Sequence, residues 1–319
     1  MECDEDLAML VDALHELLPG LRIKEQLRPL STLSHQDIAD CFGAKGYFNK
    51  TTLAMFRAAN VTSLSLRSSL CGDEVMVHRN VEETLHVFTL PNSFFNLLEI
   101  NLNDTPLTND SLISLQSLRG SLQELWIKRT GTTDAGLPHL VCLRKLTCLY
   151  LTGNSGITDE GVTNLLYMTQ LTKLELDNTG ITMTGLRLFA AGILNQTRKI
   201  ELEIPEECEH YMNTLHTQYL VHPSAPLITD PHACGFLSAN AVKKNLVEHA
   251  KYDASIQVKG AKGELILALR ELLERRRADM QVRAVLWKMD EDQETPQSDT
   301  ALQNAEEDDE RKTEYTYSS

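Results

Sequence analysis

Six side chains of the kinds that bind zinc lie close together in one segment of the chain. Zinc takes thiolate and imidazole ligands in a tetrahedral arrangement. The spacings C-x-H, H-x5-H and H-x-C match no familiar zinc finger, and ligands two residues apart need an extended turn. We therefore expect no metal and no other cofactor, and we expect the segment to pack against its neighbours. The six residues are Cys208, His210, His216, His222, His232 and Cys234.

No other pattern in the chain predicts catalysis. The motifs G-x-x-x-x-G-K-[ST], G-x-G-x-x-G, H-E-x-x-H and G-x-S-x-G, which bind phosphates, dinucleotides or zinc or present a nucleophile, are absent. Acids such as Glu175 and Asp177 occupy predicted strand positions that face solvent, where surface charges are ordinary. The sequence thus offers no catalytic residues, and we expect a protein that is not an enzyme.

The elements that position the remaining candidate residues are copies of one unit. Segments starting at Leu97, Leu122, Leu146 and Leu171 recur every 24 or 25 residues with their apolar residues in register. Each carries L-x-x-L-x-L or a near match, then a polar turn, then T-x-x-G-L or a near match that opens a helix. One unit cannot bury its leucines alone, whereas stacking against neighbours buries them. The period predicts an α/β solenoid, a class that usually binds other macromolecules.

These motifs resemble the leucine-rich repeat family, specifically the subtype with GITDEGV-like helix starts found in F-box and other ubiquitin-ligase substrate receptors. The resemblance covers residues 60–204 and implies stacked strand and helix units. The asparagine usual in this unit is present only as Asn154 and Asn178, with Thr130 and Asp104 near the other turns. We therefore expect an irregular asparagine ladder.

Strand alternation predicts which side chains face away from the leucines. With Leu125 in the core, its strand neighbours point out on the concave sheet, and the same register applies to the next strands. Trp126 and Tyr150 are expected to be stacked neighbours, and exposed aromatic side chains often anchor interfaces. The alternative is that a cap or a flanking helix covers both rings, so that they do not meet a partner. The candidate protein-binding face comprises Glu124, Trp126, Lys128, Tyr150, Lys173 and Glu175.

Residues 1–59 predict an N-terminal helical cap. Apolar residues at helical spacing cover residues 5–18, Pro19 ends that helix, and Ser34 and Asn49 open two shorter ones. Such helices would shield the apolar end of the first unit. F-box receptors carry their ligase-docking motif in the same place, although here only Leu18-Pro19 is similar to its opening.

The remaining boundaries follow from where the unit breaks down. We expect a first strand within residues 61–69, an insertion before Leu97, and a last strand at 199–204 that Pro205 ends. Residues 205–236 then form a linker.

Residues 237–288 predict a helix, an extended loop and a second helix. The stretch from Gly260 to Leu269 resembles the G-x-K-x-E-L-I-x-x-L second helix of the SAP module, a small DNA-binding unit. The resemblance implies that lysines around the helix starts and the loop meet DNA phosphates. A helical pair that docks protein is the alternative. The candidate DNA-binding residues are Lys243, Lys244, Lys259 and Lys262.

The formal net charge of −15 is unevenly distributed. Residues 237–288 carry +5, whereas residues 290–319 carry −9. The acidic tail, residues 289–319, is therefore expected to be disordered, and either to compete with phosphate for the basic module or to solubilise the chain. Three successive bases near the end of the second helix could be part of a nuclear import signal. They would equally be stabilised by the negative end of the helix dipole. These bases are Arg275, Arg276 and Arg277.

The composition places the chain inside the cell. Seven cysteines are scattered without a C-x-x-C pair, which favours a reducing compartment. No apolar run predicts a membrane span, and the N-terminus lacks a secretory pattern. We expect a monomeric, non-catalytic adaptor in the nucleus, the cytoplasm or both, which binds protein on the repeats and DNA through the SAP-like module. The alternative is a substrate receptor of a cullin-type ubiquitin ligase.

Overall fold

The computed structural model describes residues 4–27, 33–71 and 80–287. Residues Met1–Val285 form one compact unit. The acidic tail predicted at residues 289–319 lies outside the described residues.

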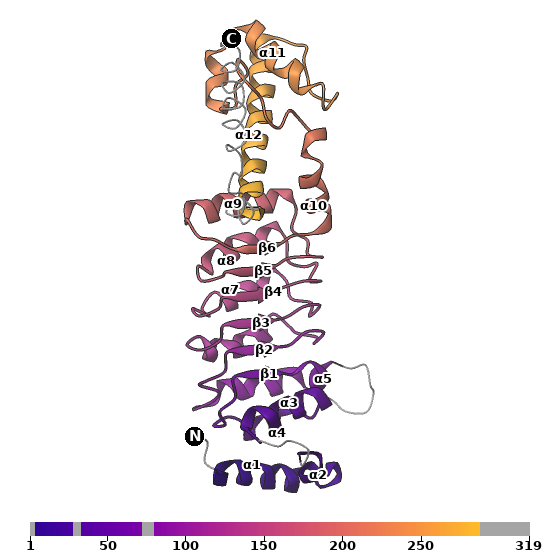
Figure 1. The fold of residues 1–319 in the computed structure, drawn as a ribbon, viewed down its shortest axis with the longest axis vertical. Coiled ribbons are helices and arrows are strands. Elements are labelled where there is room, and N and C mark those ends of the chain that lie inside the picture. Colours follow the sequence, from indigo (N-terminus) through magenta and orange to yellow (C-terminus); the bar gives the residue numbers. More distant parts are fainter. Residues whose placement is uncertain (1–3, 28–32, 72–79, 288–319) are drawn as a thin grey trace, which may run out of the picture. The chain divides into compact units, whose positions relative to one another are not determined.

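The core of the fold is a six-stranded parallel sheet in which the order of the strands follows the order of the chain (Figure 1). The chain is therefore of mixed α/β class, as the sequence predicts. Both end strands fall inside their predicted ranges, at 61–69 and 199–204. The strands are β1 (Ser63–Ser65), β2 (Glu99–Asn101), β3 (Glu124–Trp126), β4 (Cys148–Tyr150), β5 (Lys173–Glu175) and β6 (Glu201–Glu203).

The strands are held in register by the period of the sequence. Leu125 lies opposite Leu149, which in turn lies opposite Leu174, and all three are fully buried. The residues on either side of each central leucine point to the other face of the sheet, because side chains alternate along a strand. Each strand is only three residues long, so one apolar residue per strand faces the core.

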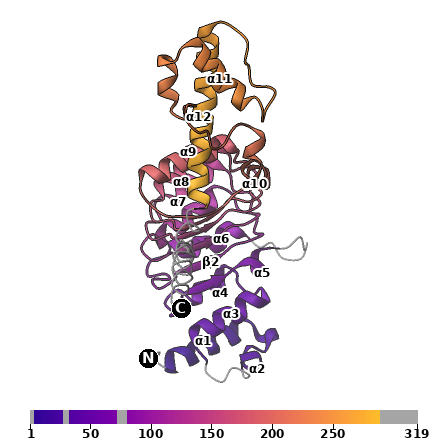
Figure 2. The ribbon, with the colours of Figure 1, turned by 45° about the horizontal axis from the view of Figure 1, so that its top comes forward.

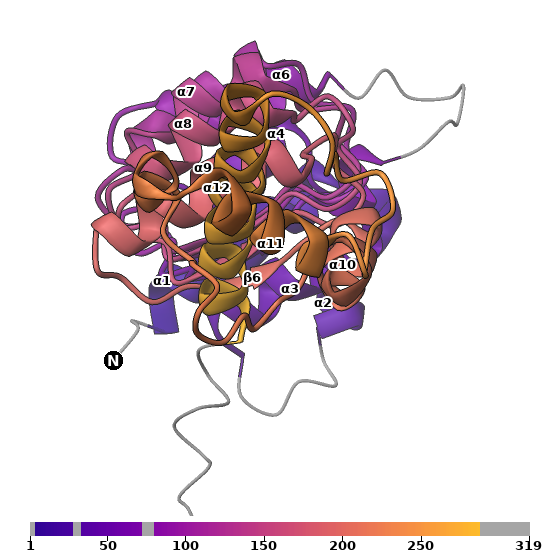
Figure 3. The ribbon, with the colours of Figure 1, turned by 90° about the horizontal axis from the view of Figure 1, so that it is seen from above.

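Helical segments follow the strands, and α7, α8 and α9 lie on the same side of the sheet (Figure 3). The insertion before β2 holds α5 (Arg67–Leu70), α6 (Val81–Leu85) and the 3-10 helix η2 (His86–Thr89). The later segments are η3 (Asp110–Leu118), η4 (Asp134–Gly136), α7 (Leu137–Leu140), η5 (Asp159–Gly161), α8 (Val162–Tyr167) and α9 (Met183–Asn195).

A hydrogen-bond ladder between successive units explains the T-x-x-G motif. The Asp134 carboxylate accepts bonds from the backbone N–H and the hydroxyl of Thr158, at 2.9 and 2.6 Å. Asp159 does the same for Thr182, at 2.8 and 2.6 Å. A Cβ at Gly161 would lie 2.3 Å from Asp134 Oδ1, so the motif needs glycine to let the carboxylate through.

The turns after the strands follow a second repeated pattern. Asp104, Arg129, Gly153 and Asn178 stand at equivalent positions, five residues after each strand begins, and all have positive φ of 51–78°. Asparagine, aspartate and glycine tolerate this left-handed conformation best. Asn178 therefore serves the turn and not the asparagine ladder, and the prediction that paired it with Asn154 is wrong.

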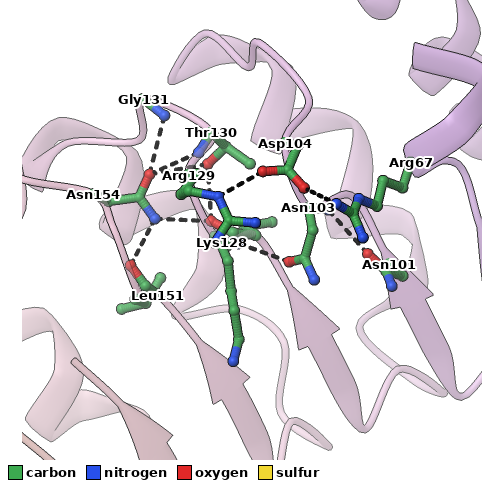
Figure 4. A network of polar contacts seen from close by, with 11 residues as sticks. Arg67, Asn101, Asn103, Asp104, Lys128, Arg129, Thr130, Gly131, Leu151 and Asn154 are labelled. Carbon is green, nitrogen blue, oxygen red and sulfur yellow. Dashed lines mark hydrogen bonds and ion pairs between the residues drawn. The ribbon is translucent and has the colours of Figure 1, made fainter. Parts of the chain in front are cut away.

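The ladder position proper comes one residue later. Asn154 is buried there, and its Oδ1 accepts bonds from the backbone N–H groups of Thr130 and Gly131, both at 3.0 Å (Figure 4). Its Nδ2 donates to the carbonyl oxygens of Ile127 and Leu151, at 2.8 and 2.7 Å. The other units place Thr105, Thr130 and Thr179 at this position. The ladder is irregular, as predicted, and threonine is its main member.

Short helices precede the sheet: α1 (Asp4–Leu17), η1 (Pro19–Leu21), α2 (Ile23–Leu27), α3 (His35–Lys45) and α4 (Lys50–Met55) (Figure 2). The predicted caps are confirmed, because Ser34 and Asn49 each form a capping box. The Gln36 Oε1 accepts hydrogen bonds from the backbone N–H groups of Thr62 and Ser63, and its Nε2 donates to the Ser63 carbonyl oxygen. Helix α3 thereby satisfies backbone polar groups along the edge of β1. Unpaired sheet edges are thereby covered.

Five helical segments follow the sheet: α10 (Glu206–Asn213), η6 (Leu215–Thr217), η7 (Pro231–Phe236), α11 (Ala239–His249) and α12 (Lys262–Leu286). A buried carboxylate of α12 connects this helix to α9, to α10 and to the segment after η6. Asp279 of α12 accepts bonds from Arg187 Nε of α9 at 2.7 Å and from the hydroxyls of Tyr219 and Tyr211 at 2.7 and 3.1 Å. A fully buried charge is tolerated because its oxygens are paired.

The register can be tested by placing a charge at a central strand position. Leu149→Asp puts an unpaired carboxylate among buried leucines and should lower the free energy of unfolding by more than about 3 kcal/mol. Thr163→Asp, on the exposed surface of α8, is the control and should change it little. Urea unfolding followed by circular dichroism measures both. Wild-type stability in Leu149→Asp would contradict the register.

Candidate functional site

The outward face of the sheet carries a row of side chains set by strand pairing. Trp126 of β3 lies opposite Asn101 on one side and opposite Tyr150 on the other. The rings of Trp126 and Tyr150 are stacked, with centroids 5.0 Å apart and planes 6° from parallel. This confirms the predicted stacking. Both side chains are half-buried, so one aromatic surface spans two neighbouring strands.

Two lysines frame the aromatic pair. Lys128 Nζ lies 5.2 Å from the centroid of the Tyr150 ring, and Lys173 Nζ lies 5.9 Å from it. Ammonium groups at this distance are attracted by the ring. The row thus combines a neutral aromatic surface with positive charge.

Glu175 lies between the lysines and departs from expectation. It was predicted to face solvent, but it is only 7% exposed. Its carboxylate pairs with Lys128 and lies 3.8 Å from Lys173 Nζ, which also pairs with Glu201 at 2.8 Å. The prediction of a free surface charge is wrong because Lys173 of the same strand and Lys128, just after β3, enclose the carboxylate. Glu175 positions the lysines more than it presents a charge to a partner.

The surroundings keep the Tyr150 hydroxyl protonated. Burial raises the pKa of Tyr150 to about 12, and nearby Cys148 and Glu124 act in the same direction. Burial, and then repulsion from Glu99 on the next strand, raise the pKa of Glu124. The Tyr150 hydroxyl is therefore a neutral donor at physiological pH, while Glu99 and Glu124 form an acidic border beside it.

The network beside this face holds the turns together (Figure 4). Asp104 pairs with Arg129 Nε at 2.6 Å and with an Arg67 amino group at 2.7 Å. These arginines, the Arg129 hydrogen bond foremost, lower the pKa of Asp104 against the effect of burial. Asn103 accepts the Lys128 backbone N–H at 2.8 Å. The chain just after β3, which carries Lys128, is thereby fixed, and sequence reasoning missed this network.

The four candidate DNA-binding lysines are all exposed. Lys243 and Lys244 lie on α11, Lys259 lies in the loop, and Lys262 begins α12. The described residues include no ion-pair partner for any of them. The start of α12 is less open than expected, because Glu264 Oε2 accepts the Ala261 N–H at 2.9 Å. A phosphate at this helix end would compete with that carboxylate.

The cysteine and histidine residues of segment 208–234 are not gathered. Cys208 and Cys234 are buried, whereas His210, His216 and His222 are exposed, as is His232. Burial raises the pKa of Cys208 to about 11, which disfavours the thiolate that binds metals. Among residues 4–27, 33–71 and 80–287, no group of three side chains has the geometry to hold a metal ion.

The three arginines near the end of the chain differ from one another. Arg276 donates to the Val221 carbonyl oxygen at 2.6 and 3.0 Å, whereas Arg275 and Arg277 are exposed. Arg276 is thus part of the packing of α12, and only its two neighbours are open to a partner.

Comparison of the chain with models of known protein families and with curated proteins gives no match. Within the described part of the chain, no helix is both long enough and apolar enough to span a bilayer.

One titratable group in the C-terminal helices is buried without full pairing. His249 Nδ1 accepts the Leu220 N–H at 3.2 Å, while its Nε2 has no partner among the described atoms. Burial, and then Arg276, lower the pKa of His249 to about 4, against a small opposing effect of Glu248. The folded state therefore holds the neutral imidazole.

His249 makes stability depend on pH. Its folded pKa lies below the ordinary value, so its contribution is present above about pH 6.5 and is lost as pH falls toward 4. Between pH 7 and pH 5 this group should remove about 2 kcal/mol from the free energy of unfolding. In His249→Gln the free energy of unfolding should fall by about 2 kcal/mol less between these pH values than in the wild type. In His222→Gln, where the histidine is exposed, it should fall as much as in the wild type. Urea unfolding at both pH values measures this, and equal pH dependence in all three proteins would contradict it.

Proposed function

We propose that the chain is a leucine-rich repeat solenoid that acts as a non-catalytic adaptor, binding a protein partner on the outward face of its sheet. Six parallel strands in chain order, with leucines in register, support the repeat fold. The observation that carries the function is the stacked pair Trp126 and Tyr150, held on adjacent strands and framed by lysines.

The composition of this face supports a protein partner. Tyrosine and tryptophan bury large areas at small cost in conformational entropy and are enriched among binding hot spots. The ion pairs of Glu175 fix Lys128 and Lys173 before binding, so less ordering is needed when a partner arrives.

A second contact, with DNA, is proposed for the C-terminal helices. Its support is the exposure of Lys243, Lys244, Lys259 and Lys262 in a region of net positive charge. The adaptor would then bring its protein partner to DNA, which is consistent with the expectation of a chain in the nucleus, the cytoplasm or both. Binding through lysines and phosphates alone would be largely independent of DNA sequence.

The protein-binding face is tested by removing the aromatic pair. Trp126→Ala with Tyr150→Ala should release the main partner from the tagged full chain, because the central aromatic surface is removed. The melting temperature should fall far less than in Leu149→Asp, since neither ring belongs to the buried core. Affinity purification with mass spectrometry and calorimetry measure the two effects.

Phe236→Ala is the matched control, because that ring is 92% exposed and lies outside the sheet. A partner that is retained by the double variant would refute the assignment of this face. Copurification of Skp1-like or cullin subunits would instead favour the ubiquitin-ligase substrate receptor.

The DNA contact is tested with the full chain and a labelled duplex in fluorescence anisotropy. Replacing Lys243, Lys244, Lys259 and Lys262 by glutamine should weaken binding, and the slope of log K against log salt should become shallower by about 0.9 for each phosphate that is no longer neutralised. Lys50→Gln, an exposed lysine of α4, is the control. Removing residues 290–319, which carry −9, should strengthen binding. Absence of binding at low salt, with or without that tail, would leave a protein-docking helical pair.

A further inference from the structure

Three adjoining hollows lie where the helical segments lead into the strands. Their volumes are about 460, 1030 and 290 Å³, and Gly120 lines all three. The first and second also share Lys145, and the first and third share Phe95 and Ser121. They therefore form one continuous groove, called here the loop groove, which crosses the chain segments that enter β2 to β5.

The middle of the loop groove is basic. Arg119, Arg144 and Lys145 line it, and all three are exposed. No described residue forms a side-chain hydrogen bond or ion pair with any of them. Burial raises the pKa of the Cys142 thiol, and the positive charges of Arg119 and Arg144 both lower it. The two guanidinium groups therefore lie near the same thiol. Among the described residues these three cations thus have no counter-charge, although the chain as a whole carries −15.

Aromatic side chains stand at the two ends of the loop groove. Phe95 is 71% exposed at one end, and Tyr167 is 66% exposed at the other. Large apolar side chains at such exposure often mark interaction surfaces. The loop groove crosses the segments that enter β2 to β5, and these strands are separated by three inter-strand spacings, or about 14 Å. A peptide of about four extended residues has this length.

We propose that the loop groove binds a short acidic segment of a partner protein, with carboxylates against Arg119, Arg144 and Lys145 and apolar residues against Phe95 and Tyr167. Guanidinium groups pair well with carboxylates because their geometry allows two parallel hydrogen bonds. The exposed rings of Phe95 and Tyr167 at the two ends favour a peptide with apolar residues over nucleic acid. This surface is separate from the Trp126 and Tyr150 face and does not depend on it.

Gly120 offers a way to block the loop groove without disturbing the fold. A Cβ added there would have nothing within 4 Å, and its φ is not in the left-handed region. Gly120→Phe should therefore fill the point that the three hollows share. Gly20→Phe is the matched control, because Gly20 has the same open surroundings and lies in η1. The double variant Arg144→Glu, Lys145→Glu changes the charge of the groove and not its shape.

The experiment uses the full chain and a labelled peptide with an Asp-Glu-Asp centre flanked by Leu and Phe, in fluorescence anisotropy. Gly120→Phe and the charge-reversed variant should each weaken binding by at least about tenfold, and added salt should weaken binding to the wild type. Gly20→Phe and the Trp126→Ala, Tyr150→Ala variant should bind like the wild type.

Three results would overturn the proposal. They are no binding of the acidic peptide at low salt, equal binding of a peptide with a Lys-Lys-Lys centre, and unchanged affinity in both groove variants. Duplex DNA is then added as a competitor to the wild type and to the variant in which Lys243, Lys244, Lys259 and Lys262 are glutamine. If DNA displaces the peptide from both proteins, the loop groove binds polyanions in general and not a peptide.

Discussion

The parallel register of six very short strands is the constraint on which the rest of the structure depends. In β1 to β5 a strand of three residues has a single apolar residue, leucine or isoleucine, in the core, so no strand is stable without its neighbours. The turns are also stabilised from the next unit, as Asp134 binds Thr158 and Asn154 binds Thr130. Any slip of one residue would break the leucine packing and these hydrogen bonds together.

The sequence predicted well those features that depend on local rules. Leucine spacing located the strands, and the capping preference of serine and asparagine located α3 and α4. Alternation along the strands also placed Trp126 beside Tyr150. These inferences succeed because the pattern and the physical cause lie within a few residues or one period of each other.

Other features were missed because their partners are distant or their offset differs by one residue. Glu175 is buried by Lys128, which lies 47 residues earlier, and Asp279 is paired with Arg187, 92 residues earlier. Asn178 differs from a ladder asparagine only in standing five residues after the strand begins, where Asn154 stands six residues after. The loop groove arises from residues that are unremarkable in each unit and meet only when units are adjacent.

The two proposed protein-binding surfaces differ in how their charges are held. On the sheet face, Lys128 and Lys173 are already paired with glutamates, so a partner there gains mainly from aromatic area. In the loop groove the cations have no partner in the part of the chain that the structure describes, so a binding protein would gain from new ion pairs that salt screens. The aromatic face is thus suited to affinity, and the groove to selecting partners by charge.

Because the strands lie in chain order, removing one strand with the segment that follows it would leave the order of the others unchanged. Excision of residues 123–147 would join β2 to β4 with Ile100 opposite Leu149, and the period of 24 residues would be kept between them. Such a loss would take Trp126 away while Tyr150 stays. The aromatic pair therefore exists only while β3 and β4 are neighbours in the sheet.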